Sequence, residues 1–530
     1  MQARLCLLIK RSFMRYRLLT FILFFVVSGA TPGTAQEQVD AAVFARIRNA
    51  ELNGSHIPEI AHYLTDVSGP RLTNSPGYQR AAEWAVKSFK KWGLRNAALE
   101  PWGEFGKQWE LREFSMSMKV PYAQPLMAFA EPWSANTAGV QQGAVVILTE
   151  SQAADTTYLL DHLAGLKGKI LLVTGDAVHS DEIFKPAASR FTEDELINIQ
   201  DNHLETRVMV EQIILRNKVR RRIDVILKRS QAIARIAASR YNVNGIVHVQ
   251  ASNGYRLTDP QSIPKVSMSF EDGQRIKRLV QSGHEVQLSL NLQGWSSNAD
   301  TKGYNVVAEI PGTDPALKSQ LVMLGGHLDS WQAATGGTDN AAGCTVVMEA
   351  MRLLDSLGLK PKRTIRIGLW GGEEQGVYGS YYYVKNHFMN ADGTPNADQR
   401  KVSGYFNFDY GTGKIRGIYA QGNTVIKPLF EAWFIPFHDL GAKTVTLKAA
   451  SSTDHLSFDW AGIPGFQFIQ DPVDEMRTHH TNLDDYDHLQ IDDLKQAAII
   501  VASFVYQASI RQEPLPRKPF VKETFVFDGL

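Results

Sequence analysis

Cysteine is almost absent from this sequence of 530 residues, which contains only Cys6 and Cys344. Cys6 lies before an apolar segment of the kind that is removed on export, so the mature chain would keep Cys344 alone. A single cysteine has no partner within its own chain. An intramolecular disulfide in the mature protein is therefore excluded.

A charge excess of either sign is also missing. The 56 lysines and arginines nearly balance the 55 aspartates and glutamates, which gives a formal net charge of +1. A balanced chain of ordinary composition gives no reason to expect a nucleic acid or an acidic polymer as partner. One basic cluster, Lys218 with the arginines at 220–222, falls in a region of helical pattern, and we interpret it as a solvated helix face.

The apolar run near the N-terminus is short. It extends from Leu18 to Ala30, whereas a membrane-spanning helix needs about 20 apolar residues. Basic residues precede this run, and the small residues at 33–35 offer a cleavage site before Gln36. We therefore interpret residues 1–35 as a signal peptide rather than as a membrane anchor. The predicted mature protein is periplasmic or secreted, with no stable membrane anchor after cleavage.

The length of the chain and its changes of pattern predict more than one domain, because 530 residues are too many for a single core. After the signal peptide we expect an N-terminal helical part, an inserted β-rich domain, a domain of alternating strands and helices, and a C-terminal tail on the surface. These parts correspond to residues 36–120, 121–295, 296–510 and 511–530.

The first part has the periodicity of amphipathic helices. Between Asp40 and Gly93, apolar residues recur at helical spacing in successive stretches. Ser75 and Pro76 provide the start of the last of these helices, and Gly93 provides its end.

The inserted region has a different pattern, with short β-rich runs separated by polar loops. It also contains a stretch of helical pattern at 192–241. The expected strands are 144–148, 169–173, 245–249, 265–269 and 286–292. No part of this region places histidines and acids at strand ends, so we predict that it contributes no metal ligand.

From residue 296 onward, strands and helices alternate. The helices are expected at 341–357 and 491–506, where apolar residues recur at helical period. The strands are expected at 305–310, 321–324, 364–369, 405–408 and 465–469. This alternation predicts an α/β fold with a mostly parallel mixed sheet and helices on both faces.

Residues with metal-binding side chains follow the strand at 321–324. His327 and Asp329 would lie just beyond its carboxyl end, where open α/β sheets place their ligands. Imidazole suits zinc, and a carboxylate can be shared by two cations. We interpret Asp329 as the residue that accepts the other ring N–H of His327 and so orients it, because metal-binding histidines usually have such a partner.

The same end of the later strands repeatedly presents acids and histidines. Glu373 and Glu374 follow the strand at 364–369, Asp409 follows the strand at 405–408, and a pair of histidines at 479–480 completes the series. Packing does not explain so many such endings in one α/β pattern. Taken singly, each has another explanation: Asp339 could cap the helix that begins near residue 341, and the two glutamates could decorate a helix N-terminus. Asp454 is expected to support the site rather than to bind metal.

Together these motifs resemble the co-catalytic zinc aminopeptidase family. The resemblance is carried by ordered elements that span about residues 36–509: His327-x-Asp329, Gly337-Thr338-Asp339-Asn340, Gly372-Glu373-Glu374, Asp409 and His480-Thr481-x-x-Asp484. It implies a zinc exopeptidase fold, and the inserted region resembles the protease-associated domain found in such enzymes.

The resemblance also implies a role for each motif residue and two Zn²⁺ ions per chain. Asp339 would bridge the two ions, with His327 and Asp409 on one and Glu374 and His480 on the other. Glu373 would be the general base. The residues themselves support this division, because adjacent glutamates cannot easily both bind metal. His479 stands where some relatives carry a tyrosine that polarises the substrate carbonyl, and we keep it as a candidate catalytic residue together with Asp329.

The predicted function is a zinc-dependent exopeptidase that hydrolyses N-terminal residues of short peptides or dipeptides. Two other classes stay open: a single-zinc acyltransferase of the glutaminyl-cyclase type on the same fold, and a binding protein that has lost its metals. The full set of metal-binding positions argues against the binding protein, and the bridging position with His327 and Asp409 argues against a single zinc. A homodimer stays open as well.

Overall fold

The computed structural model describes residues 37, 39–176, 186, 188–201, 206–239, 243–251 and 253–522. The chain divides into two units, Met1–Gln38 and Val39–Leu530. The first unit contains the predicted signal peptide and lies almost entirely outside the described residues. The fold described below is therefore that of the second unit. In the described part of the chain, no helix combines the length and apolarity needed to cross a membrane.

A mixed sheet of eight strands forms the centre of the α/β part, in the order β1-β10-β12-β11-β13-β16-β14-β15. Neighbours from β12 to β16 are parallel, whereas β1, β10 and β14 run antiparallel to the strands beside them on the inner side. The strands are β1 (Arg95–Glu104), β10 (Lys302–Ile310), β11 (Leu321–His327), β12 (Thr364–Trp370), β13 (Val402–Asn407), β14 (Ile415–Tyr419), β15 (Thr444–Thr446) and β16 (Gly465–Gln470).

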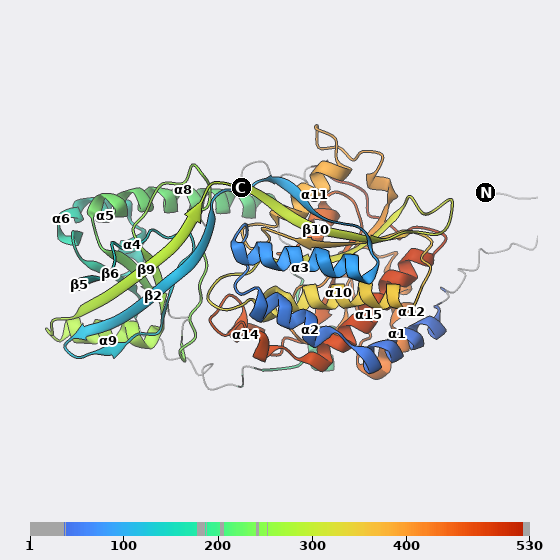
Figure 1. Ribbon diagram of the computed structural model, residues 1–530, viewed down its shortest axis with the longest axis horizontal. Coiled ribbons are helices and arrows are strands. Elements are labelled where there is room, and N and C mark those ends of the chain that lie inside the picture. The colour runs from blue at the N-terminus through green and yellow to red at the C-terminus, as the bar shows by residue number, and fades with distance from the viewer. Residues whose placement is uncertain are drawn as a thin grey trace, which may run out of the picture. The chain divides into compact units, whose positions relative to one another are not determined.

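Helices cover both faces of this sheet, as expected for parallel strands. One face packs into the main apolar core, and Figure 1 shows α3, α2, α10, α15 and α1 on this side. These are α1 (Ala41–Gly54), α2 (Ile57–His62), α3 (Pro76–Trp92), α10 (Ala342–Ser356) and α15 (Ile491–Ile510). The predicted caps of α3 are present, since Ser75 accepts a hydrogen bond from the Tyr78 amide and Gly93 is left-handed at φ 93°.

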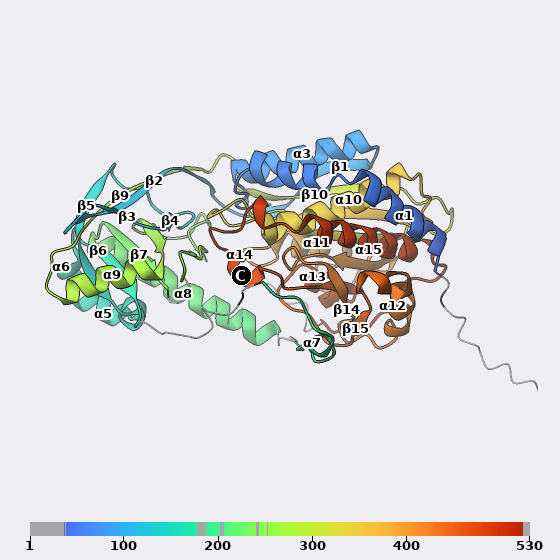
Figure 2. The ribbon, with the colours of Figure 1, turned by 90° about the horizontal axis from the view of Figure 1, so that it is seen from below.

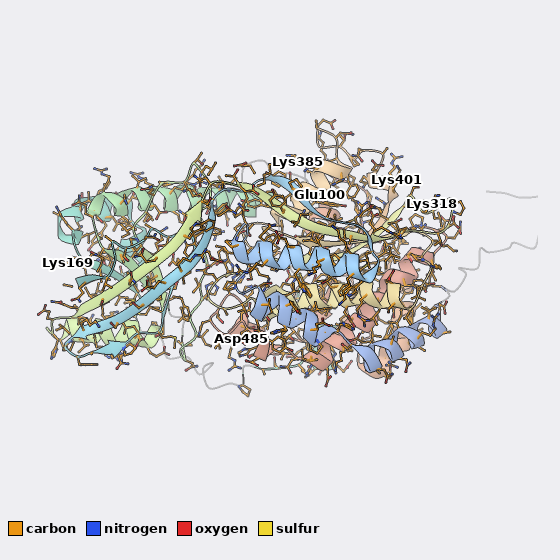
Figure 3. The ribbon with its side chains drawn as sticks, in the orientation of Figure 1. Glu100, Lys169, Lys318, Lys385, Lys401 and Asp485 are labelled. Carbon is orange, nitrogen blue, oxygen red and sulfur yellow. The ribbon has the colours of Figure 1, made fainter. Side chains whose placement is uncertain are left out.

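The opposite face carries α11 (Tyr378–Phe388) and α13 (His455–Trp460), which enclose a second core around Trp370 and Tyr405. The side chain of His387 on α11 contacts Glu100 of β1. Figure 3 labels Glu100 and shows Lys385 of the same helix nearby. The two helix layers together give the α/β architecture that the sequence pattern predicts.

A second sheet of eight strands lies in the same unit, in the order β3-β2-β9-β5-β6-β7-β8-β4. It is mixed, with a parallel run from β5 to β8. Its apolar core lies under β2, β6, β8 and β9. The strands are β2 (Gln108–Val120), β3 (Gln124–Pro125), β4 (Ala128–Ala130), β5 (Gln141–Leu148), β6 (Ile170–Thr174), β7 (Ala234–Ala238), β8 (Lys265–Met268) and β9 (Gln287–Ser297).

Several elements differ from the predicted pattern. The strands β1, β2, β14 and β15 were not expected, and the stretch at 192–241 contains β7 as well as α8 (Thr206–Ser230). An alanine-rich segment such as β7 has weak intrinsic strand preference, so its pairing with β6 and β8 decides its conformation. The expected strand at 245–249 is wrong: this segment forms a single bridge between His248 and Thr481 instead of a place in the sheet.

Candidate metal centre

His327 is the last residue of β11 and is only 1% exposed. Its Nδ1 donates a hydrogen bond to the main-chain oxygen of Asp329 at 3.0 Å. The other ring nitrogen, Nε2, lies 3.1 Å from Asp339 Oδ1 and 3.3 Å from Asp409 Oδ1. Because Nδ1 carries the proton in this bond, the Nε2 lone pair faces the carboxylates, where a cation can use it.

Electrostatics at this position favour positive charge. Burial alone would lower the pKa of His327, but the carboxylates of Asp409 and Glu373 outweigh it and raise the pKa well above its ordinary value. A proton on the His327 ring or a metal ion bound to it would each compensate the negative charge of these carboxylates.

Asp339 lies between the two histidines of the site. It belongs to the irregular turn at Gly337–Ala341, between β11 and α10, and its carboxylate is almost fully buried. Oδ1 faces His327, and Oδ2 lies 3.0 Å from His480 Nε2. Burial would raise its pKa, but the contacts with His327 and His480 hold the pKa of Asp339 well below its usual range. A carboxylate with one oxygen toward each histidine has the arrangement that a bridging ligand requires.

The turn that carries Asp339 is held from the loop after His480. The Asp484 carboxylate accepts hydrogen bonds from the Thr338 main-chain amide at 2.5 Å and from its hydroxyl at 2.8 Å. Gly337 packs so closely on the backbone of Asp485 that a Cβ would lie 2.2 Å from its carbonyl oxygen. Only glycine fits there, which explains why the motif Gly337-Thr338-Asp339-Asn340 begins with glycine.

Glu374 faces His480 on the other side of Asp339. Its Oε2 lies 2.9 Å from His480 Nε2. Burial and the neighbouring Asp339 raise the pKa of Glu374 to about 7. The other oxygen, Oε1, is buried and has no hydrogen-bond partner among the described residues.

The carboxylate of Asp329 organises the Glu373–Glu374 turn. It accepts hydrogen bonds from the main-chain amides of Glu373 and Glu374, both at 3.3 Å, and from the Thr73 hydroxyl at 2.7 Å. Its Oδ1 is 3.6 Å from His327 Nδ1, farther than the main-chain oxygen of the same residue. Asp329 therefore orients the histidine through its carbonyl, whereas we expected the carboxylate, and the side chain positions the two glutamates.

Glu373 lies beside the site without joining either group of metal-capable side chains that the described residues form. Burial raises the pKa of Glu373 well above its usual value, and the carboxylates of Asp409 and Asp454 act in the same direction, against His327. The two adjacent glutamates thus have different surroundings, as the sequence suggested.

His479 lies at the open edge of the site. Its side chain is 51% exposed, and its Nε2 is 3.8 Å from Asp339 Oδ2. The ring stacks on His480 with centroids 3.7 Å apart. Partial removal of the ring from solvent, and then the neighbouring His480, lower the pKa of His479, so the neutral imidazole is favoured.

The residues fit a metal centre. Among the residues that the structure describes, two groups of side chains hold their possible ligand atoms within 4.8 Å of one another, namely Asp339 with His479 and His480, and His327 with Asp339 and Glu374. Asp339 Oδ2 is buried and makes no hydrogen bond of suitable geometry with the described residues, although His480 Nε2 lies 3.0 Å away. Buried carboxylate oxygens without hydrogen bonds, facing imidazole nitrogens, suit a cation better than they suit one another. Neither group contains a residue of the inserted region.

Three supporting residues lie around this centre. Asp454 is fully buried, neither of its oxygens has a hydrogen-bond partner in the described part of the chain, and burial raises its pKa to about 8. It joins neither metal-capable group, and the same is true of Asp409, so the supporting role of Asp454 stays a prediction. Arg71 and Thr73 were not predicted. Arg71 is fully buried and donates to the main-chain oxygens of Leu328 and Gly336, and the sequence gives no periodic signal for such a loop residue.

Most of these site residues lie in a segment that matches a known family. Residues 305–505 match the model of peptidase family M28. Carboxypeptidase Q from Bos taurus is 26% identical over 454 residues, which cover 86% of this chain and 85% of that protein. Carboxypeptidase Q from Homo sapiens is 30% identical over 258 residues, so that this alignment covers 48% of the chain and about half of the relative, 52%.

Solved structures share the fold. A peptidase M28 precursor from Shewanella amazonensis aligns with a TM-score of 0.65 and 24% identity, over 90% of this chain and 99% of that one. A zinc aminopeptidase from Bacillus subtilis aligns with a TM-score of 0.55 and 20% identity, over 86% of this chain and 95% of that one. Both align across the second sheet as well as the α/β part.

Proposed function

The chain belongs to peptidase family M28, the metallo-exopeptidases, and on that premise we propose that it is a two-zinc exopeptidase that removes N-terminal residues from short peptides or dipeptides. The observation that carries the proposal is the position of Asp339 between two half-sites. One half-site is His327 with Asp409, and the other is His480 with Glu374.

Each residue of the site has a separate role in the proposed reaction. When bound, two zinc ions would lower the pKa of a water molecule and polarise the scissile carbonyl. Glu373 would accept the proton of that water on its carboxylate and then donate it to the nitrogen of the leaving amine. Asp329 holds the main-chain amides of the Glu373–Glu374 turn and so fixes the position of the base. His479, at the open edge, can present a ring N–H to the oxygen of the carbonyl.

We also propose that the inserted region, residues 121–295, is a protease-associated-like domain that shapes the substrate entrance. Trp133 of this region contacts Trp331 edge to face, with ring centroids 6.2 Å apart. Trp331 in turn lies 6.0 Å from the ring of His480. Bulky side chains this close to the site would restrict long substrates and favour short ones.

The proposal is tested by metal analysis of the purified protein together with a panel of short peptides that differ only in blocked N- or C-termini. We expect two zinc ions per chain and hydrolysis that requires a free N-terminus. One zinc ion with cyclisation of N-terminal glutamine would instead indicate an acyltransferase. Absence of both zinc and hydrolysis would indicate a binding protein.

A further inference from the structure

The loop that carries His480 has little regular structure of its own. It begins after β16 at Asp471 and runs to Asp484, and its only helix in the described structure, α14, is Glu475–Thr478. His480 itself has a left-handed backbone, with φ 59°. A residue other than glycine in this conformation persists only where its surroundings hold it.

The inserted region contacts this loop at the His480 turn. The main-chain amide of Val249 donates to the His480 carbonyl oxygen at 2.9 Å, and the Asn482 amide donates to the Val247 carbonyl oxygen at 3.2 Å. The Asn482 side chain accepts a hydrogen bond from the Val247 amide at 2.6 Å and donates to Gly245 at 3.5 Å. The segment at 245–249 and the turn at 480–482 therefore form a short antiparallel pair around the bridge between His248 and Thr481.

A second contact holds the start of the same loop. The Ser189 amide donates to the Val473 carbonyl oxygen at 2.8 Å, and the Phe191 amide donates to Asp471 Oδ1 at 3.0 Å. Arg190 pairs with the buried carboxylate of Asp471 at 3.0 Å. Figure 2 shows α7 (Glu193–Ile197), which follows this segment, beside β14 and β15.

Apolar packing anchors the second contact to the α/β part. Leu196 and Ile199 of the inserted region pack against Ile469 of β16, with Phe191 and Tyr419 at the edge of the cluster. The segment at 189–199 is thus fixed to the α/β sheet near the end of β16, where the loop that carries His480 begins.

From these contacts we infer that the inserted region is a two-point clamp on the loop that carries His480, and that Asn482 is a positioning residue for this metal ligand. The inference rests on the proposed zinc centre. The contacts at 189–191 fix where the loop leaves β16, and those at 245–249 fix the turn whose backbone aims the imidazole at Asp339 and Glu374. The His327 half-site depends on this loop only through Asp484, which holds the turn of the shared ligand Asp339, because His327 itself belongs to β11 in the middle of the sheet.

Asn482→Ala tests the clamp, since it removes two hydrogen bonds to the inserted region and touches neither half-site. We expect zinc affinity to fall by about 10- to 100-fold at one of the two sites, as for other partners of metal ligands. Zinc stoichiometry is measured at a series of free zinc concentrations set by a chelator buffer. In a Glu374→Ala background, where only the His327 half-site remains strong, Asn482→Ala should weaken the remaining affinity much less than it weakens the His480 site.

Asn136→Ala is the matched control. Asn136 also makes two side-chain hydrogen bonds to backbone groups, with the Gly294 amide at 2.7 Å and its carbonyl oxygen at 2.9 Å, but both lie within the second sheet. It should keep wild-type zinc affinity at both sites. If Asn482→Ala folds poorly, Arg190→Ala at the other contact takes its place, because the Arg190 side chain is 46% exposed.

The outcomes separate this inference from the proposed function. Wild-type protein that binds fewer than two zinc ions would contradict the zinc centre, and the clamp with it. Wild-type protein with two zinc ions, together with an Asn482→Ala variant of unchanged affinity, would overturn the clamp alone. Equal weakening at both sites, or equal weakening in the Asn136→Ala control, would also overturn it, since a general loss of stability would then be the cause.

Discussion

Glu373 and Glu374 are neighbours in the chain, but their carboxylates face different groups. Glu374 lies 2.9 Å from His480, whereas the charged neighbours of Glu373 include His327, Asp409 and Asp454. The turn that carries them is fixed by Asp329, whose carboxylate accepts hydrogen bonds from both main-chain amides. A single substitution at each position therefore probes metal binding and proton transfer separately.

We expect Glu374→Ala to lose zinc from one site together with activity, because one of its few protein ligands is gone. Glu373→Gln should keep both zinc ions and lose turnover by about 10²- to 10⁴-fold, since the amide is nearly isosteric but cannot accept the proton. The measurement is zinc stoichiometry beside kcat for each variant. Loss of zinc from Glu373→Gln with full zinc in Glu374→Gln would reverse the two roles.

At the residue scale, the sequence predicted which side chains meet but not every atom that they use. His327, Asp339 and Asp409 could be located because each follows or borders a buried strand or helix with a clear apolar pattern. The use of the Asp329 carbonyl rather than its carboxylate toward His327 depends on the backbone path of two residues, which no spacing rule gives. Arg71 was missed for a related reason, since its partners are carbonyl oxygens of distant loops.

Among the elements, α1 and α10 place two buried carboxylates, Glu51 and Glu349, close to each other. Glu51 of α1 is 0% exposed, and neither of its oxygens has a hydrogen-bond partner with suitable geometry among the described residues. Burial, and then Glu349 of α10, raise the pKa of Glu51 from 4.5 to about 8. A carboxyl group whose pKa is raised on folding binds its proton more tightly in the folded state.

Stability should therefore fall as the pH rises from about 4.5 to about 8, by up to about 1.4 kcal/mol per pH unit from this group. Glu51→Gln, which stays neutral, should remove this dependence and raise the Tm relative to wild type at pH 8 more than at pH 5. Thermal unfolding at the two pH values measures the difference. Glu83→Gln, at an exposed glutamate of α3, is the control, and an equal change in both variants would contradict the prediction.

The elements that could be predicted are those whose sequence shows one period over their full length. The buried strands β11, β12, β13 and β16 are short apolar runs, α3 has helical period with recognisable ends, and α15 has helical period. The strands β14 and β15 lie at the sheet edge and are short, so their sequence resembles that of loops. β1 follows a helical region directly, and β1 and β2 pair with strands 167 to 214 residues away in sequence, which local patterns cannot reveal.

For the whole molecule, we predict that the N-terminal segment directs the protein to export. Residues 1–35 lie outside the described structure, and their prediction as a signal peptide rests on the basic residues, the short apolar run and the small residues before Gln36. We expect the mature protein to begin near Gln36 and to be recovered from the periplasm or the medium. Mass spectrometry of the exported protein tests this, and a membrane-bound form that retains the run from Leu18 to Ala30 would contradict it.

The zinc centre should also stabilise the whole molecule. Several buried acids surround it, and burial is the main cause that raises the pKa of Glu374 to about 7, of Asp484 to about 7 and of Asp454 to about 8. Without metal, the folded protein holds protons on these groups that the unfolded chain would release, so the metal-free form should lose stability as the pH rises through the interval from about 4 to about 8.

Bound zinc ions would compensate the same negative charge without protons, and binding to the folded state adds about 4 kcal/mol at a free zinc concentration 1,000 times the dissociation constant. Zinc also competes better as its histidine ligands lose protons. We therefore expect zinc to raise the Tm by several degrees, and the gain to be larger at pH 8 than at pH 5.5. Thermal unfolding with buffered zinc and with chelator, at both pH values, measures this gain. Glu374→Ala should show a smaller gain because one half-site is impaired, and a Tm that is independent of zinc at both pH values would show that the metals do not support the fold.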